Sequence, residues 1–334
     1  MFVLRRRLRG QVRFMKGKVL AFGEIMMRLA AVNGSICDSK VFEACYGGTE
    51  ANVLACMSNL GCSTKYLTAL PDTELGQAVI NHLRSFNVDT SDVVVRGDTL
   101  GMYFVEDGTA SRGSNVLYLR KHSEFTKLSE QDFDFERIFD GVTLFHVSGI
   151  SFALSESSRR LAFRLLQEAK SRGIKISFDF NYRAKLWSVD VAREQLVKAA
   201  SYADILLAST LDLTTFLQVD EQEVFDMYGC EYLILRDRKV ICATEHSVKV
   251  KVLKRASKPL CFETEEIKFA VAEKIGGGDA FDGCMLHALL RGDDLKAATR
   301  FAVAGFILKH QQKGDTFCAN QSQVEKFALN LGVK

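Results

Sequence analysis

Short hydrophobic runs alternate with amphipathic segments along most of the chain. The runs are typical of buried β-strands and occupy residues 18–23, 65–70, 142–147, 175–180 and 204–207. Segments with helical spacing follow them, at 47–61, 71–86, 156–171, 190–202 and 211–228. Because parallel strands need long crossovers, which helices usually provide, this alternation predicts an α/β fold with a mostly parallel sheet covered by helices.

Two segments break this alternation. Residues 25–46 show no helical periodicity, and residues 93–120 contain β-rich pieces separated by a polar turn. We expect them to form a small β-sheet, a lid over the C-terminal edge of the parallel strands. Shorter strands are expected at 231–235, 240–243 and 248–252, and helices at 278–290, 294–309 and 321–331. Since no linker rich in Pro, Gly or Ser divides the chain, residues 15–334 are expected to form a single domain.

The composition is that of an ordinary globular protein. Of 334 residues, 47% are hydrophobic and 25% charged, and the net charge is only +3, which excludes disorder as the main state. No uncharged apolar run approaches the ~18 residues that a membrane-spanning helix needs. Nine cysteines are scattered without CxxC pairs. This usage predicts free thiols in a reducing cytoplasm and no structural zinc site.

The N-terminus carries the one clear charge asymmetry. Residues 1–14 contain five arginines and no acidic residue, so the rest of the chain has a net charge of about −2. The segment is interpreted as a basic, disordered extension, although a tail for anionic partners or a targeting segment has the same composition. Because the remaining chain is slightly acidic, neither nucleic acid nor a membrane is an expected partner.

The sharpest local feature is Gly276-Gly277-Gly278-Asp279 at the start of a predicted helix. Glycines let the backbone approach a ligand closely, and free N–H groups at a helix N-terminus bind anions. Asp279 would repel a phosphate unless it faces a hydroxyl that loses its proton while the amides hold the transferred phosphoryl group. An ordinary helix start with an acidic first turn explains the same residues. The pattern alone therefore leaves both interpretations open.

Two groups of residues lie where ligands bind in open α/β sheets. Asp179, Asn181 and Arg183 emerge at the C-terminal end of a predicted strand, which favours a binding site. Gly47 and Gly48 precede the first predicted helix and allow close backbone approach. Helix packing against the sheet explains the glycine pair as well, and a turn explains the polar cluster.

A third group lies on the predicted lid. Tyr118 and Arg120 alternate along a strand and share one face, and Tyr103 is expected on a neighbouring strand. Phenols hydrogen-bond hydroxyls and a guanidinium binds a carboxylate with two parallel hydrogen bonds, so the set suits a carboxylated polyol. An amphipathic stripe on a half-exposed sheet is an equally good explanation of these three residues.

Together these features resemble the ribokinase-like (PfkB) carbohydrate kinases from about Lys18 to Asp315. Gly47-Gly48 with Asn52 and Gly61 matches the amino-terminal signature of that family, and Gly276 to Phe281 matches the carboxy-terminal one. Narrower motifs resemble its 2-keto-3-deoxygluconate kinase subgroup, and these are Gly101-Met102-Tyr103-Phe104, Tyr118-Leu119-Arg120, Asp179-Phe180-Asn181-Tyr182-Arg183, Leu308-Lys309-His310 and Gly314-Asp315. The resemblance implies a ribokinase-like three-layer α/β/α sandwich with a small β-sheet lid.

The resemblance also implies an activity, ATP-dependent phosphorylation of the primary hydroxyl of 2-keto-3-deoxygluconate. Asp279 would be the general base, and the amides of Gly276, Gly277 and Gly278 would form the anion hole. A carboxylate near a helix N-terminus is expected to stay ionised at neutral pH with a lowered pKa. The lid would exclude water and so suppress hydrolysis of ATP.

Further site residues and partners follow from the same resemblance. The implied contacts to the sugar acid are Gly48, Tyr103, Tyr118, Arg120, Asn181, Arg183 and Asp315. The implied nucleotide contacts are Ser209, Asp212, Arg236, Gly276 and Gly278. Mg²⁺ would accompany ATP, a monovalent cation such as K⁺ would bind near the site as in some relatives, and a homodimer or higher homo-oligomer is expected.

The nucleotide side departs from the family pattern. The family motif Asn-x-x-Glu is replaced by Ser209-Thr210-Leu211-Asp212, and residues 236–239 stand where a glycine-rich stretch is usual. No glycine occurs between Gly229 and Gly276. Two alternatives therefore stay open beside the sugar-acid kinase. One is a kinase of another sugar, fructokinase-like or ribokinase-like, and the other is a non-catalytic sugar-acid sensor that keeps the kinase fold.

Overall fold

The structure, a computed structural model, describes residues 17–32, 35–106, 115–257 and 260–331. The basic extension predicted at residues 1–14 lies outside the described residues, as does most of the polar turn predicted within 93–120.

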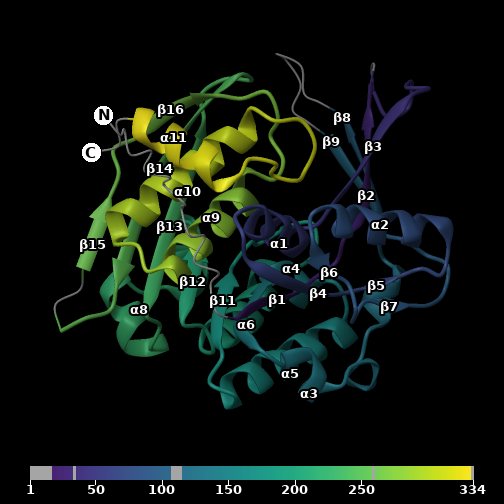
Figure 1. Cartoon of the computed structure of the whole chain (residues 1–334), viewed down its shortest axis with the longest axis horizontal. Helices are drawn as coiled ribbons and strands as arrows, with labels where there is room; N and C mark the ends of the chain where they lie inside the picture. The colour runs from purple at the N-terminus through teal and green to yellow at the C-terminus, as the bar shows by residue number, and fades with distance from the viewer. Residues whose placement is uncertain (1–16, 33–34, 107–114, 258–259, 332–334) are drawn as a thin grey trace, which may run out of the picture.

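A single large sheet forms the centre of the molecule (Figure 1). Its strands run in the order β15-β14-β13-β12-β11-β10-β1-β4-β6, and β16 pairs with β14 beside this path. The strands from β13 to β6 are parallel, and β14, β15 and β16 are antiparallel to their neighbours. Their bounds are β1 (Lys18–Phe22), β4 (Ser63–Leu67), β6 (Val88–Asp89), β10 (Val142–Ser148), β11 (Lys175–Asp179), β12 (Ile205–Ala208), β13 (Tyr232–Val240), β14 (Glu245–Lys254), β15 (Leu260–Glu263) and β16 (Ile267–Ala270).

Helices cover both faces of this sheet. In β1, Val19 and Ala21 face one hydrophobic core, whereas Leu20 and Phe22 face the other, as strand alternation requires. The first core also contains residues of α1 (Thr49–Asn59), α2 (Glu74–Ser85), α9 (Gly277–Arg291), α10 (Leu295–His310) and α11 (Gln321–Asn330). The second contains residues of α3 (Phe135–Phe139), α4 (Gly149–Ala153), α5 (Glu156–Ser171), α6 (Val189–Ala200) and α8 (Glu221–Tyr228). The predicted three-layer α/β/α sandwich is confirmed.

A second, smaller sheet stands at one side of the sandwich, at the upper right of Figure 1. This small sheet has the order β3-β2-β8-β9, with bounds β3 (Phe42–Gly47), β2 (Met26–Ala31), β8 (Met102–Glu106) and β9 (Asn115–Leu119). It is the sheet predicted as a lid from residues 25–46 and 93–120. One piece of the second segment lies elsewhere, because β7 (Val94–Val95) pairs with β5 (Ala69–Leu70).

Two predicted elements are wrong in detail. The helix expected at 211–228 is divided into α7 (Thr210–Asp212), one π-helical turn (Leu213–Leu217) and α8, because Gln218 takes the left-handed conformation with a φ of 57° and Asp220 caps a new helix. Residues 241–244 form the turn of the β13–β14 hairpin rather than a strand. The apolar side chains that suggested a strand there, Val240 and Ile241, are exposed at the tip of the hairpin.

The topology places a binding site at one edge of the sheet. From β1 the chain proceeds to β4 and β6 on one side, and later from β10 to β13 on the other. The carboxyl ends of the strands that flank this reversal are where ligands bind in open α/β sheets. All nine cysteines lie in described segments and none forms a disulfide. No helix of the described residues combines the length and apolar character that crossing a bilayer requires.

Candidate active site

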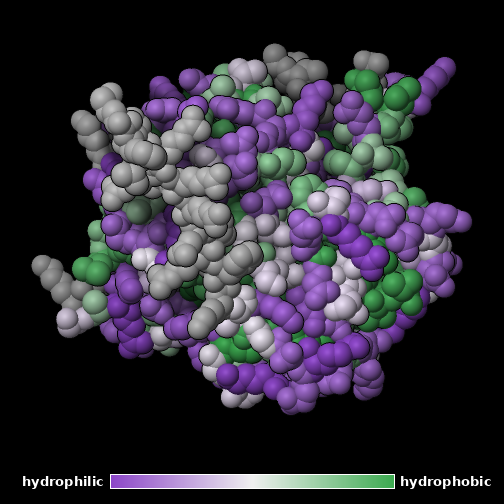
Figure 2. All heavy atoms as spheres, viewed as in Figure 1, coloured by the Kyte–Doolittle hydropathy of each residue, from purple (hydrophilic) through white to green (hydrophobic). Residues whose placement is uncertain are grey.

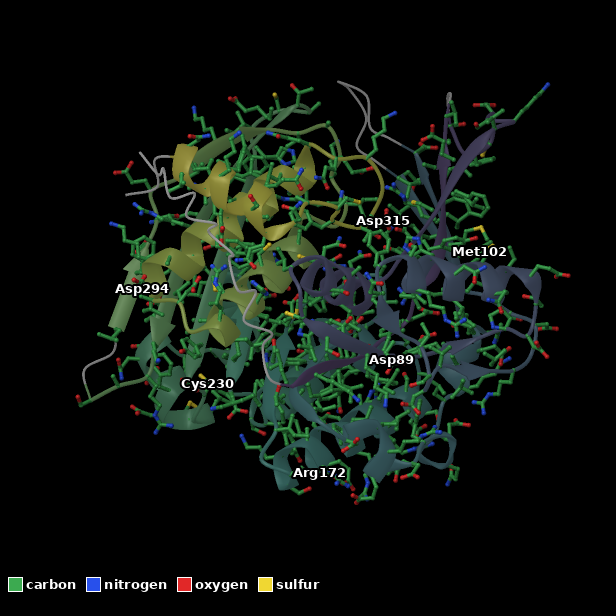
Figure 3. The ribbon with its side chains drawn as sticks, in the orientation of Figure 1. Asp89, Met102, Arg172, Cys230, Asp294 and Asp315 are labelled. Carbon is green, nitrogen blue, oxygen red and sulfur yellow. The ribbon has the colours of Figure 1, made fainter. Side chains whose placement is uncertain are left out.

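A cavity of about 720 Å³ opens at the carboxyl ends of the parallel strands, beneath the small sheet. This volume suits a small-molecule ligand. In Figure 3, Asp315 lies where the small sheet, marked by Met102, approaches the C-terminal helices. All the site residues predicted from the sequence line this one cavity, namely Gly48, Tyr103, Tyr118, Arg120, Asn181, Arg183, Ser209, Asp212, Arg236, Gly276, Gly277, Gly278, Asp279 and Asp315.

The turn formed by Gly276, Gly277 and Gly278 leads into α9 and has no room for side chains. Gly276 has a φ of 79°, and a Cβ there would lie 2.1 Å from the carbonyl oxygen of Asp315. A Cβ on Gly277 would lie 2.0 Å from Cε1 of His310. No side chain caps the N-terminus of α9. The first-turn N–H groups of this 15-residue helix therefore form a site suited to an anion.

Asp279 lies in the first turn of α9, half-buried at the wall of the cavity. Its Oδ2 accepts a hydrogen bond of 2.7 Å from Nδ2 of Asn52, which belongs to α1. Burial raises the pKa of Asp279, although the bond from Asn52 and the guanidiniums of Arg183 and Arg236 act in the opposite direction. The expectation of a lowered pKa is therefore wrong, because loss of solvation outweighs the favourable charges nearby.

The glycine pair before α1 serves packing as well as the cavity. A Cβ on Gly47 would lie 2.1 Å from Oδ2 of Asp315, and one on Gly48 would lie 2.1 Å from the carbonyl oxygen of Glu24. Both glycines therefore let α1 approach the end of β1 and the C-terminal loop. Gly48 in addition lines the cavity.

Two aromatic residues of the small sheet face the cavity as a pair. Tyr103 and Tyr118 are cross-strand neighbours whose rings stack with centroids 5.7 Å apart. The hydroxyl of Tyr103 donates to Oδ2 of Asp315 at 2.6 Å. Arg120 is paired with Glu24, whose Oε2 accepts from Nε at 2.6 Å. Sequence reasoning missed Glu24, which comes directly after β1 and holds part of the Arg120 guanidinium.

Arg183 differs from Arg120 because its guanidinium is exposed and unpaired. In the described part of the chain its one hydrogen-bond partner is the neighbouring carbonyl of Tyr182, at 3.1 Å from Nη1. Asn181, with a φ of 38°, donates through Nδ2 to the hydroxyl of Thr49 at 3.3 Å. The end of β11 therefore presents one free cation and one amide to the cavity.

On the predicted nucleotide side, Ser209 and Asp212 form a capping box. Oδ2 of Asp212 accepts from the N–H and the hydroxyl of Ser209, at 2.8 and 2.7 Å. Arg236 is held against the anion-binding turn, because its Nη1 donates to the carbonyl of Gly278 at 2.7 Å and its guanidinium lies over the ring of Phe281.

Arg238, which the sequence analysis did not single out, completes a basic cluster beside this turn. Burial and the guanidiniums of Arg236 and Arg183 lower the pKa of Arg238. Its Nη1 lies 3.3 Å from Nε2 of His310, and no carboxylate of the described residues pairs with it. Arg236 also pairs with the buried Asp282, with Nη1 at 3.3 Å from Oδ1, whereas Arg183 and Arg238 have no ion-pair partner among the described residues. This cluster of guanidiniums favours an anionic ligand.

Buried carboxyl groups surround the cavity floor. Burial raises the pKa of Glu50 to about 7, although its Oε1 accepts hydrogen bonds from the N–H and hydroxyl of Ser148 and from Ser151. Burial likewise raises the pKa of Asp179 to about 6 and that of Asp282 well above its usual value. Each loses more solvation than its partners restore. No group of three or more His, Cys, Asp or Glu side chains in the described residues could hold a metal ion on its own.

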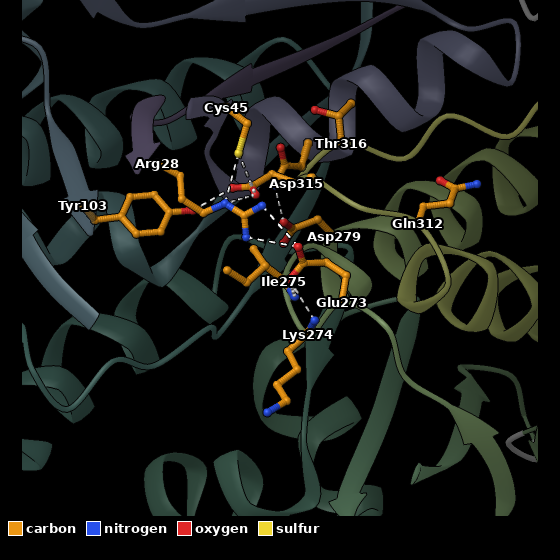
Figure 4. A network of polar contacts seen from close by, with 12 residues as sticks. Arg28, Cys45, Tyr103, Glu273, Lys274, Ile275, Asp279, Gln312, Asp315 and Thr316 are labelled. Atoms are coloured by element: carbon orange, nitrogen blue, oxygen red, sulfur yellow. Dashed lines mark hydrogen bonds and ion pairs between the residues drawn. The ribbon is translucent and has the colours of Figure 1, made fainter. Parts of the chain in front are cut away.

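A polar network joins the small sheet to the segment before the anion-binding turn (Figure 4). Arg28 of β2 lies between two carboxylates, with Nε at 2.9 Å from Oδ1 of Asp315 and Nη2 at 3.2 Å from Oε2 of Glu273. Oε1 of Glu273 accepts the backbone N–H groups of Lys274 and Ile275, at 2.9 and 3.3 Å. The small sheet is thus connected by side chains to the residues that precede Gly276.

Several residues of this arrangement carried little signal in the sequence. Asn52 is part of the amino-terminal signature, so its place beside Asp279 could have been inferred from that motif. Glu24, Arg28 and Arg238 belong to no motif, and each has a partner at the site that is 70 or more residues away in the chain. Pairings of that kind depend on the folded arrangement of the strands.

Comparison with known proteins gives a consistent result. The sequence model of the pfkB family carbohydrate kinases matches residues 16–322. A protein of Haloferax volcanii named 2-dehydro-3-deoxygalactonokinase is 31% identical over 93% of this chain and 96% of its own length. A crystal structure described as 2-dehydro-3-deoxygluconokinase of Thermotoga maritima has a TM-score of 0.89 and 32% identity, and covers 94% of this chain and 98% of that one.

A more distant structure shares the fold alone. It is described as a putative ribokinase II of E. coli in complex with ATP and Mg²⁺, with a TM-score of 0.79 and 20% identity. It covers 94% of this chain and 99% of that chain.

Proposed function

The chain belongs to the pfkB family of carbohydrate kinases, and from this premise we propose that it phosphorylates 2-keto-3-deoxygluconate with ATP as the donor. The acceptor is the primary hydroxyl, and the product is 2-keto-3-deoxy-6-phosphogluconate. The compound is the 2-dehydro-3-deoxygluconate in the name of the Thermotoga maritima relative.

The single observation that carries this proposal is the position of Asp279 directly after the anion-binding turn. Its carboxylate accepts the proton of the sugar's primary hydroxyl as the hydroxyl oxygen attacks the γ-phosphorus. The backbone N–H groups that follow Gly276 stabilise the negative charge of the transferred phosphoryl group. Asn52 orients the carboxylate through its 2.7 Å hydrogen bond. The raised pKa of Asp279 makes it a stronger base than an ordinary aspartate.

The remaining cavity residues supply contacts to the sugar acid. Arg183 has a free guanidinium and is our candidate for the substrate carboxylate. Tyr118, Asn181 and the backbone at Gly48 offer hydrogen bonds to hydroxyl groups. We also propose that Tyr103, Arg120 and Asp315 contact the sugar acid. Tyr103 and Asp315 pair with each other, Arg120 pairs with Glu24, and Asp315 also pairs with Arg28. The contacts to the sugar acid would come from the polar groups that these pairs leave free.

The donor side fits a nucleotide that brings its own magnesium. Mg²⁺ is usually held by one or two carboxylates together with phosphate oxygens. Asp212 is the candidate, because its Oδ1 has no hydrogen-bond partner among the described residues. Ser209, Arg236 and the amides at Gly276 and Gly278 are proposed to contact the phosphates. Bound Mg²⁺ would neutralise phosphate charge, and the arginine cluster acts in the same direction.

The test of the proposal is Asp279→Asn. Loss of a general base typically costs ~10²–10⁴-fold in rate, so phosphorylation is expected to fall by that factor in a coupled ADP-release assay. Binding of the sugar acid, measured by calorimetry, should persist because the amide keeps the shape of the side chain. Asp294→Asn is the matched control, since Asp294 is the exposed N-cap of α10 and asparagine caps a helix equally well. An Asp279→Asn enzyme with almost unchanged turnover would refute the assigned role.

A second sugar is favoured by one specific comparison, the Haloferax volcanii relative named for the galactonate epimer. The two substrates differ in the configuration of one hydroxyl. A panel of ketodeoxygluconate, ketodeoxygalactonate, fructose and ribose, compared by kcat/KM, distinguishes them. Highest kcat/KM for a neutral sugar would contradict the role given to Arg183, whereas preference for the galactonate epimer would change the stereochemical assignment alone.

A further inference from the structure

Lys309 is a fully buried cation without an acidic partner. It lies in the last turn of α10 and its exposed fraction is 0%. Its Nζ donates to the carbonyl oxygens of Gln312 and Gly314, at 3.0 and 2.6 Å. No described carboxylate lies within ion-pair distance. Burying an ammonium costs several kcal/mol unless the surroundings compensate it, and lysines are almost never fully buried without such a partner.

The side chain passes directly beneath the anion-binding turn. A Cβ on Gly276 would lie 3.1 Å from Cε of Lys309 and 2.1 Å from the carbonyl oxygen of Asp315. The same end of α10 holds the preceding segment, because the carbonyl of His310 accepts the N–H groups of Ala272 and Glu273 at 2.8 and 3.0 Å. Lys309 therefore connects the loop at 312–315 to the turn that begins at Gly276.

The hydrogen-bond partners of Lys309 favour its ammonium form. Burial lowers the pKa of Lys309, as does the guanidinium of Arg28, whereas the carboxylates of Glu273, Asp315 and Asp279 act in the opposite direction. Both hydrogen-bond partners are carbonyl oxygens, which only accept. The end of a helix, where carbonyls point outwards, also favours a positive charge.

Backbone carbonyls that converge on one point are the ligands that proteins use for monovalent cations such as K⁺. In this chain a covalently attached ammonium takes that position. A methionine would fill the same space without the cost of burying a charge, so packing alone gives no reason for a lysine there.

We propose that the Lys309 ammonium is a built-in monovalent cation that positions the anion-binding turn at 276–278, so that the kinase needs no dissociable K⁺. The inference rests on the proposed phosphoryl transfer and goes beyond it. It replaces the expectation that a monovalent cation binds near the site. Lys309 acts as a positioning residue, because it contacts the loops around the turn and not the reacting atoms.

The first test uses the wild-type enzyme. Turnover is measured at constant ionic strength with chloride salts of K⁺, Na⁺, NH₄⁺ or choline as the only added monovalent cation. Equal kcat in all four salts is the expected result. Activity that is present with K⁺ and absent with choline would overturn the proposal. This measurement requires no variant of the protein.

The second test compares two neutral variants. Lys309→Ala opens a space beside the two carbonyls, and its kcat is expected to fall by about 10²-fold, the usual effect of removing one group from an anion-stabilising site, with a smaller change in KM for the sugar acid. NH₄⁺ or K⁺ should restore part of that loss in a saturable manner, whereas choline should not. Lys309→Met fills the space, so no cation should restore its activity. Lys313→Ala is the matched control, because Lys313 is an exposed lysine in the same loop.

A third measurement separates this inference from the substrate assignment. Without sugar or nucleotide, NH₄⁺ should raise the melting temperature of Lys309→Ala with increasing concentration and leave Lys309→Met unchanged, because a cation that binds only the folded protein stabilises it. A lowered kcat in Lys309→Ala with no response to either cation would show a purely structural role and refute the proposal. If the wild type phosphorylates no sugar acid, the proposed function fails, while the thermal test of the cation site stands.

Discussion

At the scale of single residues, the proposed reaction depends on the opposing effects that set the pKa of Asp279. In the proposed reaction its carboxylate must be ionised to accept a proton, yet burial raises its pKa. The hydrogen bond from Asn52 and the charges of Arg183 and Arg236 keep that increase in check. The rate is therefore expected to fall as the pH falls through the raised pKa, at a higher pH than for an exposed aspartate.

The variant Asn52→Ala tests this balance. Without the hydrogen bond that favours the ionised form, the pKa of Asp279 rises further, so the acidic limb of the pH profile of kcat/KM should move to higher pH. The activity of Asn52→Ala should fall more at pH values below the acidic limb than at pH values above it. Asn59→Ala is the control, because Asn59 lies on the same helix and bonds the carbonyl of Phe317 instead. An unmoved acidic limb in Asn52→Ala, or an equal movement in Asn59→Ala, would contradict the assignment.

The sequence was a good guide to which residues lie at the site. It was a poorer guide to the partners that each residue contacts there. The glycines and Asp279 at the start of a helix can be recognised from the local sequence, because their spacing in the chain alone determines how they lie relative to one another. Arg120 and Asp315 were expected to face a ligand, yet each also pairs with a buried partner, Glu24 and Arg28. Glu24 lies between β1 and β2 and Arg28 lies in β2, both far from their partners in the chain, and local sequence contains no information on such distant pairing.

At the scale of elements, Arg28 makes the small sheet and the anion-binding segment depend on each other. One guanidinium neutralises both Asp315 and Glu273, and its side chain is only 7% exposed. Removing it leaves the buried carboxylate of Asp315 and the partly exposed carboxylate of Glu273 without their cation. Glu273 in turn holds the N–H groups of Lys274 and Ile275, so the effect reaches the residues before Gly276.

Arg28→Met is expected to lower the free energy of unfolding by about 3 kcal/mol or more, as for other broken buried ion pairs, and to lower kcat/KM as well. Denaturant unfolding and steady-state kinetics measure the two effects. Arg160→Met removes an exposed ion pair with Glu156 and should cost under ~1 kcal/mol. Combining Arg28→Met with Glu273→Gln should give less than the sum of the two losses. Additive losses would mean that the two residues act independently.

Helices and strands with a strong hydrophobic periodicity were predicted more accurately than those with a weak one. Long helices such as α5 (Glu156–Ser171) and the buried parallel strands were predicted with nearly their observed bounds. The short elements α4, β15 and β16 were not, because four or five residues show too little periodicity. The hairpin tip at Val240 was misread since exposed apolar residues there resemble a strand.

At the scale of the whole molecule, one face of the small sheet presents exposed apolar side chains among the described residues. Tyr103 and Tyr118 point to the cavity, so alternation directs Leu117 and Leu119 to the opposite face, where they are 48% and 50% exposed. Figure 2 shows hydrophobic residues gathered over this sheet at the upper right. A second copy of the chain is the partner that we propose for this face, in keeping with the expected homodimer.

The double variant Leu117→Glu, Leu119→Glu tests the dimer. Light scattering or sedimentation should find a dimer for the wild type and a monomer for the variant, because two buried carboxylates in an apolar interface are costly. Turnover measured beside it shows whether the cavity face is intact. A monomeric wild type, or a variant that stays dimeric, would exclude this face as the contact.

The packing of His310 against Gly277 has a consequence for how this kinase diverges. Because the imidazole occupies the space that a side chain at position 277 would need, a larger residue at 277 would displace His310 or the turn at 276–278. A larger residue at 277 is therefore expected only after a smaller one has been accepted at 310. The order in which the two positions can change is thus constrained.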